Sequence, residues 1–333
     1  NVLGPTVKEI RELRKFWDDW LKTRRKQILK LRKRMERDES RLAETDATFL
    51  FDSTEALAEE FGADSVVVSR DYSPYGRARD GAVADALHGS DRALRGVGSP
   101  YAVDPGTVRK GDGSPYAVFT PFSKVWRRTG WHGPHPWPCD VRGAGAGSTG
   151  IDSDGLPSRP DHGCHLPDTG ESAALDRWRR FIDSTGAADG TMRSGVDAYD
   201  DLRDRPALTG TSHLSPDLKW GTIHPRTLLA DLDASGSGER GHTVFSSELA
   251  WRDFYADVLF HQPHTAWENL NPKLDDIELD TGAAAEEKFA MWCAGRTGFG
   301  IVDAGMRQLQ ATGWMHNRVR MIVASFLVKD LHL

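Results

Sequence analysis

A run rich in Gly, Ser, Asp and Pro, residues 143–170, separates two parts of the chain that differ in hydrophobic pattern. Such a composition favours a linker, which we place at residues 131–170. Before the linker, short apolar runs alternate with amphipathic stretches, as is typical of an α/β fold. After it, residues 171–333 follow a helical period of about 3.6 residues throughout. The sequence therefore predicts an α/β domain at 45–130 and an all-helical domain at 171–333.

The α/β part has two predicted strands, residues 47–51 and 64–72, and each is followed by a predicted helix. The second run, DSVVVSRDY, is apolar enough for a strand buried in a parallel sheet. Ser53 or Thr54 is the expected N-cap of the first helix, and the second helix covers GRARDGAVADAL. Two strands with their helices make half of a doubly wound sheet, so we expect an incomplete parallel sheet.

Residues 7–44 are predicted to form one long basic helix. Leu21, Ile28, Met35 and Leu42 recur every seven residues, which indicates a coiled-coil stripe or a docking stripe for a helix partner. Residues 1–44 hold 14 Lys and Arg against 8 Asp and Glu, a net of +6, so the rest of this −6 chain carries −12. The basic run either contacts nucleic acid or forms the solvent-exposed face of the helix. We assign residues 1–44 to a separate unit of unknown origin.

Composition narrows the class of protein. Hydrophobic residues make up 38% of the chain and charged residues 28%, within the globular range, and no apolar run is long enough to span a membrane. Three widely spaced cysteines, Cys139, Cys164 and Cys293, form no disulfide framework, which suits a reducing cytosol and predicts a cytoplasmic location. The run HGCH at 162–165 has no second pair of ligands nearby, so we predict no metal site.

Hydroxyl groups cluster in the segment 199–221. Thr211, Ser212 and Ser215 lie within five residues, and Ser215 before Pro216 is the expected N-cap of a helix. Hydroxyls and free N–H groups at a helix start suit a phosphate. Ser and Thr caps are also common without any ligand, so a purely structural role stays open.

A second polar face lies on the predicted helix around residues 246–255. Glu248, Trp251, Arg252 and Tyr255 are spaced so that they share one side of a helix. The alternative is an exposed Glu248–Arg252 ion pair within that helix, which contributes only about 0.2–0.5 kcal/mol. An aromatic ring between charges favours a pocket wall instead.

The last predicted helix follows the Thr312-Gly313 break and has an apolar stripe and an opposite polar face. The stripe consists of Val319, Ile322, Val323, Phe326 and Leu327, and the polar face of Trp314, Asn317, Arg318 and Met321. An indole and a thioether are not expected on a solvent-exposed helix face. Three segments that combine aromatic and charged residues predict a cavity for a flat aromatic body with polar edges, either a nucleobase, a flavin or both.

Several of these segments resemble the DNA photolyase/cryptochrome family. They are RDYSPYGRARD, KGDGSPYAVFTPF, TGTSHLSPDLKWG, SSELAWRDFY and GRTGFGIVDAGMRQLQATGWMHNRVRMIVASFLVKDL. They occur in the family's order, and the similarity covers roughly residues 47–333. Asn317-Arg318 after His316 resembles the class I branch, which repairs cyclobutane pyrimidine dimers. The resemblance implies an N-terminal α/β domain and a helical domain that holds FAD.

The activity implied by the resemblance is that of a deoxyribodipyrimidine photo-lyase, a carbon–carbon lyase. In such an enzyme, light drives an electron from reduced FAD to a flipped-out dimer in ultraviolet-damaged DNA. One alternative is a cryptochrome-like sensor that binds flavin without repair, and Glu248, Trp251, Asn317 and Met321 argue against it. Another is a non-enzymatic DNA-binding or helix-docking module led by residues 1–44.

The resemblance also implies roles for individual residues. Those lining the FAD phosphates and ribityl chain are Tyr199, Thr211, Ser212, His213, Leu214 and Ser215. Those near the flavin are Phe245, where some members have Trp, together with Arg252 and Arg320. Those facing the dimer or DNA are Arg203, Glu248, Trp251, Asn317, Arg318 and Met321, and four of them, Glu248, Trp251, Asn317 and Met321, are the catalytic candidates. Trp292 matches the solvent-end member of a tryptophan electron-transfer chain.

Parts of the family pattern have no counterpart in the sequence. Members begin with a strand that carries an Arg-rich stretch, and they continue with helices beyond the position of Leu333. The resemblance therefore implies a chain truncated at both ends, with an unknown antenna chromophore. We expect such a chain by itself to hold FAD poorly and not to repair DNA.

Overall fold

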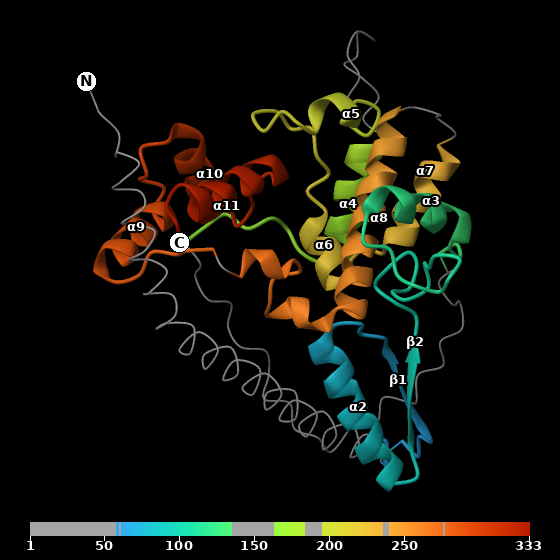
Figure 1. The fold of residues 1–333 in the computed structure, drawn as a ribbon. Helices are drawn as coiled ribbons and strands as arrows, with labels where there is room; N and C mark the ends of the chain where they lie inside the picture. The colour runs from blue at the N-terminus through green and yellow to red at the C-terminus, as the bar shows by residue number, and fades with distance from the viewer. Residues whose placement is uncertain (1–57, 60, 135–162, 184–194, 236–239, 276) are drawn as a thin grey trace, which may run out of the picture.

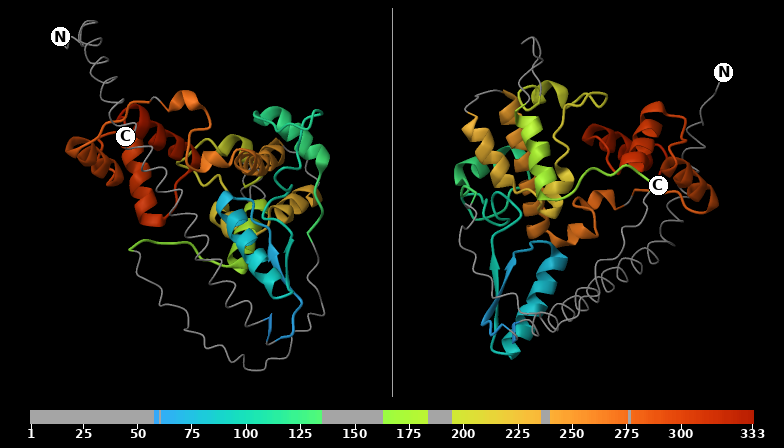
Figure 2. Two further views of the ribbon diagram at one scale, coloured as in Figure 1. Left: turned by 60° about the horizontal axis from the view of Figure 1, so that its bottom comes forward. Right: turned by 180° about the vertical axis from the view of Figure 1, so that it is seen from behind.

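The computed structural model describes residues 58–59, 61–134, 163–183, 195–235, 240–275 and 277–333. The described chain runs from a small α/β piece into a body of helices around the long helix α8 (Arg240–His261), and then into a smaller lobe (Figure 1). Figure 2 shows the α/β piece at one end of the body and the lobe beside it. The predicted helix 7–44, the predicted strand 47–51 and most of the predicted linker lie outside the described residues.

The α/β piece contains two parallel strands, β1 (Ser65–Ser69) and β2 (Ala93–Val97), joined through helix α2 (Pro74–Gly89). The Ser73 hydroxyl caps α2 by accepting from the Gly76 N–H at 3.0 Å, and the apolar side of α2 packs on the sheet. A parallel strand followed by a helix is thus confirmed. The expected burial of the strand is wrong, because Val67 is 58% exposed where the described chain covers one face only.

Strand β2 was not predicted from the sequence. Its run ALRGV alternates over only five residues, with Leu94 and Gly96 half-buried and the others exposed. So short an alternation, containing an Arg and a Gly, does not stand out from a loop.

The helical body is built from α3 (Phe119–Thr129), α4 (Glu171–Ile182), α5 (Tyr199–Leu202), α6 (Ser215–Trp220), α7 (Pro225–Ala234) and α8. Its core is rich in aromatic rings, among them Phe122, Trp126, Trp178, Phe245 and Phe254. The core takes in residues 102–126 from before the predicted linker, so α3 packs with the helices that follow it. The predicted boundary at residue 130 stays a prediction.

Three helices form what we call the C-terminal lobe, residues 283–329. These are α9 (Ala283–Cys293), α10 (Gly300–Thr312) and α11 (Asn317–Lys329), and two short 3-10 helices, Pro263–Ala266 and Pro272–Leu274, lead into the lobe. The lobe has its own core, formed by Val302, Met306, Met315, Val319, Val323 and Phe326. Three residues of the predicted stripe are therefore buried, whereas Ile322 is 38% exposed.

The predicted start of the last helix is displaced in the structure. The His316 ring accepts from the Arg318 N–H at 3.1 Å and so caps α11, which begins at Asn317. Trp314 consequently lies in the connection between α10 and α11 rather than on the polar face of the helix. A histidine cap leaves a weaker sequence signal than the usual Ser, Thr, Asp or Asn.

Close packing of α10 on α11 gives a first testable prediction. A Cβ atom on Gly305 would overlap the Val319 Cγ1 methyl and lie 3.3 Å from Val323 Cγ2. Because β-branched core side chains yield little, we expect Gly305→Ala to lower the free energy of unfolding by about 1–3 kcal/mol. Urea unfolding followed by circular dichroism would measure it. Gly300→Ala in the same helix is the control, since its Cβ meets nothing within 4 Å. Equal stability of the two variants would contradict this packing.

Candidate functional site

A chain of four charged side chains connects α8 with α11. Arg203 Nη1 donates to Glu248 Oε1 at 2.5 Å, and Arg203 Nε lies 3.7 Å from Asp204 Oδ1. Arg318 Nε donates to that same Asp204 oxygen at 2.6 Å. The structure thus brings together three residues predicted for the site, Arg203, Glu248 and Arg318. The fourth, Asp204, was missed, because an Asp in the charge-rich run DDLRDR has no distinguishing pattern.

Tyr199 lies beneath this chain of charges, with its side chain 8% exposed. Burial, and next the Glu248 carboxylate, raise the pKa of Tyr199 to about 12. The Arg203 guanidinium carbon lies 5.6 Å from the centre of the Tyr199 ring. The phenol therefore stays protonated at neutral pH and remains a hydrogen-bond donor. Phe245, another predicted cofactor residue, packs against Tyr199 with ring centres 5.2 Å apart.

The predicted phosphate-binding segment lies next to the C-terminal lobe. Thr211, Ser212 and His213 are half-buried, Leu214 is buried and Ser215 is exposed. The His213 ring stacks on Trp314 at 4.0 Å between ring centres, and its φ of 55° lies in the left-handed region. The expected N-cap is wrong, because Leu214 holds that position and Ser215 is the first residue of α6. Burial of Leu214 in the core fixes where this short helix starts.

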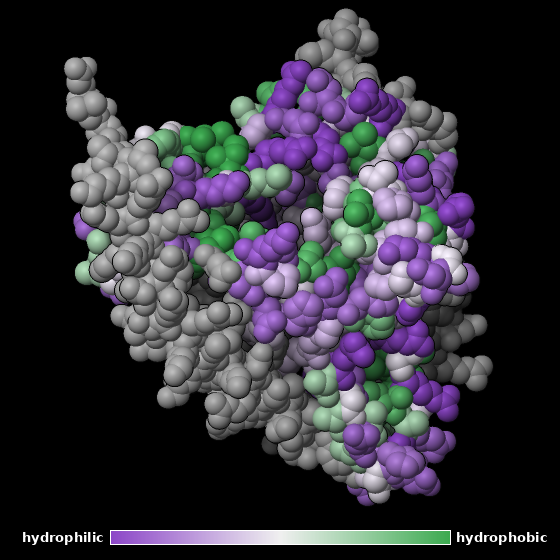
Figure 3. All heavy atoms as spheres, viewed as in Figure 1, coloured by the Kyte–Doolittle hydropathy of each residue, from purple (hydrophilic) through white to green (hydrophobic). Residues whose placement is uncertain are grey.

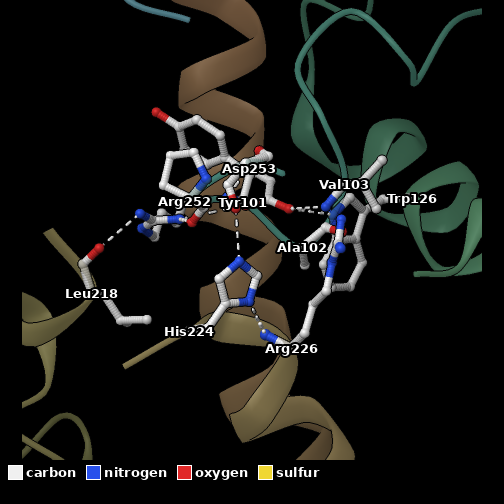
Figure 4. A network of polar contacts seen from close by, with 11 residues as sticks. Tyr101, Ala102, Val103, Trp126, Leu218, His224, Arg226, Arg252 and Asp253 are labelled. Carbon is white, nitrogen blue, oxygen red and sulfur yellow. Dashed lines mark hydrogen bonds and ion pairs between the residues drawn. The ribbon is translucent and has the colours of Figure 1, made fainter. Parts of the chain in front are cut away.

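Arg252 is held at the junction between α8 and the α/β side of the chain (Figure 4). Its two terminal nitrogens donate to the carbonyls of Pro100 at 2.7 Å and Leu218 at 2.9 Å. Its guanidinium also lies over the Tyr101 ring, 4.7 Å from the ring centre. Glu248 and Arg252 share a helix but bind different partners, so the alternative of an intrahelical pair is wrong. A cofactor role for Arg252 stays a prediction.

Trp251 belongs to a stack of aromatic rings on α8 and α3. Phe119 lies parallel to the indole, with ring centres 3.7 Å apart and planes at 7°. Tyr255, one turn later on α8 and 63% exposed, stacks at 5.5 Å. Trp251 itself is only partly buried. The indole is therefore held by two stacked rings and keeps only part of its surface exposed.

The other predicted residues lie on or against α11. Asn317 begins α11 and is exposed, and Met321 is 56% exposed with its sulfur 3.7 Å from Arg318 Nη1. Arg320 donates to the Met315 carbonyl at 2.9 Å. The Trp292 indole N–H on α9 donates to the Val323 carbonyl at 3.2 Å, which ties α9 to α11. The individual roles of these residues stay predictions.

Figure 3 shows a hollow in the surface between α11 and α8, with hydrophilic residues at its rim near α5. Neither the Thr211 nor the Ser215 hydroxyl bonds to another residue within the described ranges. Such donors fit the diphosphate and ribityl chain of a dinucleotide cofactor. Tyr199 and Phe245 are buried in the aromatic core, and their role in a cofactor site stays a prediction. Over the ranges that the structure describes, no His, Cys, Asp and Glu group could hold a metal ion, and no helix is long and apolar enough to cross a membrane.

A small parallel sheet followed by a helical body with such a recess defines the class as an α/β plus helical cofactor-binding protein. Residues 18–141 match the family described as DNA photolyase, and residues 245–333 match the FAD binding domain of DNA photolyase. The first match begins within the predicted basic helix. The chain belongs to the DNA photolyase/cryptochrome family.

Individual relatives agree with this assignment. A deoxyribodipyrimidine photo-lyase of Halobacterium salinarum is 38% identical over an alignment of 290 residues, and the match covers 83% of this chain and 57% of that protein. A class III photolyase structure from Agrobacterium tumefaciens is 32% identical, with a TM-score of 0.67, covering 85% of this chain and 58% of that one. A Synechocystis cryptochrome structure, 21% identical with a TM-score of 0.63 over 83% and 57% of the two chains, supports the fold alone.

The chain thus spans little more than half the length of these relatives. The expected family is confirmed. The expected class I branch stays a prediction, and the Agrobacterium structure is described as class III.

Proposed function

We propose that the protein containing this chain repairs cyclobutane pyrimidine dimers in DNA, in a light-driven reaction that depends on FAD. The observation that carries the proposal is the set of contacts through which Asp204 joins Glu248 and Arg203 to Arg318, although these residues come from separate parts of the chain. Membership of the photolyase family supports it. The finer architecture we propose is part of a doubly wound sheet at 45–130 and an FAD-binding domain at 171–333.

Two arginines would give the recess its affinity for DNA. The chain carries a net charge of −6, so its overall field repels DNA and attraction must come from a local patch. Arg203 and Arg318 would supply its positive groups, and their remaining N–H groups would meet phosphates, while Glu248 and Asp204 offset part of their charge. A dimer must leave the duplex at a cost of a few kcal/mol, which the distorted base pairing of a lesion reduces.

Within the recess, Trp251 would offer an apolar surface to the dimer, with Phe119 holding the indole in place. Glu248, held by Arg203, would accept a hydrogen bond from a base edge. Asn317 and Met321, at the start of α11, would line the opposite side. Ser212 and its neighbours at 211–215 would hold the cofactor phosphates.

Bound FAD in its reduced form would supply, after absorbing light, the electron that splits the cyclobutane ring. The protein then binds and orients the cofactor and the dimer and shields them from water, rather than moving protons. Tyr199, Phe245, Arg252 and Arg320 would form the remaining wall of the cofactor site. The Tyr199 phenol, whose pKa is about 12, contributes as a neutral donor and not as a base.

The test uses the chain joined to the parts of the Halobacterium relative that it does not match, since the chain spans 57% of that protein. The chimera is loaded with FAD, reduced and illuminated with an oligonucleotide that contains a thymine dimer. We expect loss of dimers in light and not in darkness. Stoichiometric flavin without light-dependent dimer loss would favour the cryptochrome-like sensor. Salt-sensitive DNA binding that ignores the damage, without flavin, would favour the DNA-binding module.

A further inference from the structure

We propose that Asp204 is a positioning residue, which fixes the spacing of Arg203 and Arg318 so that the recess prefers dimer-containing DNA to intact DNA. The inference rests on the proposed function. It assigns a role to an acidic side chain within a surface that must attract a polyanion.

The contacts place a single carboxylate oxygen between the two guanidinium groups. Asp204 Oδ1 lies 2.6 Å from Arg318 Nε and 3.7 Å from Arg203 Nε. Arg203 is held from its other end by Glu248 at 2.5 Å. Arg318 has only the Met321 sulfur at 3.7 Å as a further side-chain contact in the described chain, and a thioether is a weak acceptor.

The same carboxylate joins two parts of the molecule that have separate cores. Asp204 follows α5 in the helical body, whereas Arg318 lies in the first turn of α11 in the C-terminal lobe. The stack of His213 on Trp314 at 4.0 Å is another contact between these parts. Asp204 therefore determines how far the arginine of the lobe stands from the arginine of the body.

Removing this charge has two opposite consequences for DNA binding. The patch becomes more positive by one unit, which strengthens attraction to the phosphates of any DNA. The two guanidinium groups then repel each other, and Arg318 is free to take other rotamers. Discrimination depends on both arginines meeting one distorted site, so the preference for the dimer falls while affinity for intact DNA rises.

A plain stabilising ion pair would behave differently. The side chains of Asp204 and Arg318 are 56% and 36% exposed, and exposed pairs contribute little to the stability of a fold. Loss of such a pair would leave the DNA preference unchanged apart from the general effect of charge. Asp201 offers a matched control for charge, because it pairs with Arg205 at 2.9 Å beside the same short helix and is 61% exposed.

The experiment compares the full 333-residue chain with its Asp204→Asn, Asp204→Glu and Asp201→Asn variants. Each is titrated in darkness with a duplex containing one thymine dimer and with the same duplex undamaged. We expect Asp204→Asn to bind undamaged DNA about twofold more tightly and to lose roughly five- to tenfold of its preference for the dimer. Asp201→Asn should show only the first effect, and Asp204→Glu should restore most of the preference.

The outcomes separate this inference from the proposed function. If the unmodified chain prefers the dimer and Asp204→Asn keeps that preference, the positioning role is wrong and the proposed function stands. Equal loss of preference in Asp204→Asn and Asp201→Asn would also overturn it, because charge alone would then explain the effect. An unmodified chain that binds both duplexes equally would overturn this inference, because there would be no preference for Asp204 to support, and the proposed function would still be decided by the chimera.

Discussion

Replacing Asp253 by alanine is expected to lower the free energy of unfolding by about 2–5 kcal/mol at mildly acidic pH. The carboxylate is 2% exposed, and its Oδ2 accepts from the Val103 N–H at 3.0 Å and the Trp126 indole N–H at 2.9 Å (Figure 4). Alanine would leave both donors buried without a partner. These contacts tie the loop around Val103, and through Trp126 helix α3, to α8. Urea unfolding followed by circular dichroism at about pH 4.5 would measure the loss.

The free energy of unfolding lost in Asp253→Ala should depend on pH. The direction of this dependence follows from the burial of Asp253. Burial raises the pKa of Asp253 from 3.8 to about 6, although the bonds from Val103 and Trp126 oppose that rise. Between these pH values the folded protein holds a proton that the unfolded chain has released. Its stability therefore falls as pH rises through this window and is level above it. From about pH 4.5 to about pH 7.5, the cost of Asp253→Ala should shrink by about 2 kcal/mol.

Asp253→Asn serves as the control that separates the lost hydrogen bonds from the lost titration of the carboxyl group. The amide oxygen can still accept from Val103 and Trp126, so the variant should be more stable than Asp253→Ala. Its NH2 group would replace Oδ1, which has no hydrogen-bond partner in the described chain, so some cost remains. Neither variant should show the pH-dependent contribution of the carboxyl group. A pH-independent difference from the unmodified protein would show that Asp253 does not titrate with a raised pKa.

The elements predicted correctly are those whose pattern is local. Helix α2 contains the predicted stretch GRARDGAVADAL, and the helical period after residue 171 holds through α4 and α7 to α11. Strand β2 needs its partner β1 to become recognisable, since its own five residues are ambiguous. The expected burial of β1 failed for a similar reason. A run of valines shows that a strand can be buried, and only the rest of the fold determines how many of its faces are covered.

The sequence predicted which residues belong to the candidate site better than it predicted which of them contact one another. The spacing of Glu248 and Arg252 correctly placed both on one helix, but their partners come from residues about 30 to 150 positions away. No local pattern predicts such distant contacts. Asp253 went unnoticed because an acidic residue on an amphipathic helix usually faces solvent. Asp204 went unnoticed because its role depends on Arg318, which lies 114 residues later.

Trp251→Ala is the substitution expected to reduce damage recognition most among the predicted aromatic residues. Stacking of a base on an aromatic side chain contributes about 1–3 kcal/mol, so affinity for dimer-containing DNA should fall by that amount. Phe119 and Tyr255 both stack on the indole, so its loss would also leave them without the ring against which they stack. Intact DNA, which keeps its bases stacked in the duplex, should bind nearly as before.

Trp220→Ala provides the matched control, because this indole on α6 is 80% exposed and belongs to none of the predicted site residues. It should leave binding of both duplexes unchanged, whereas Trp251→Phe should retain part of the preference through its smaller ring. Fluorescence anisotropy with the two duplexes, after circular dichroism has confirmed folding, measures all three variants. Equal losses on damaged and intact DNA would remove Trp251 from the dimer site. The recess between α8 and α11 would then bind DNA through Arg203 and Arg318 without recognising the lesion by stacking.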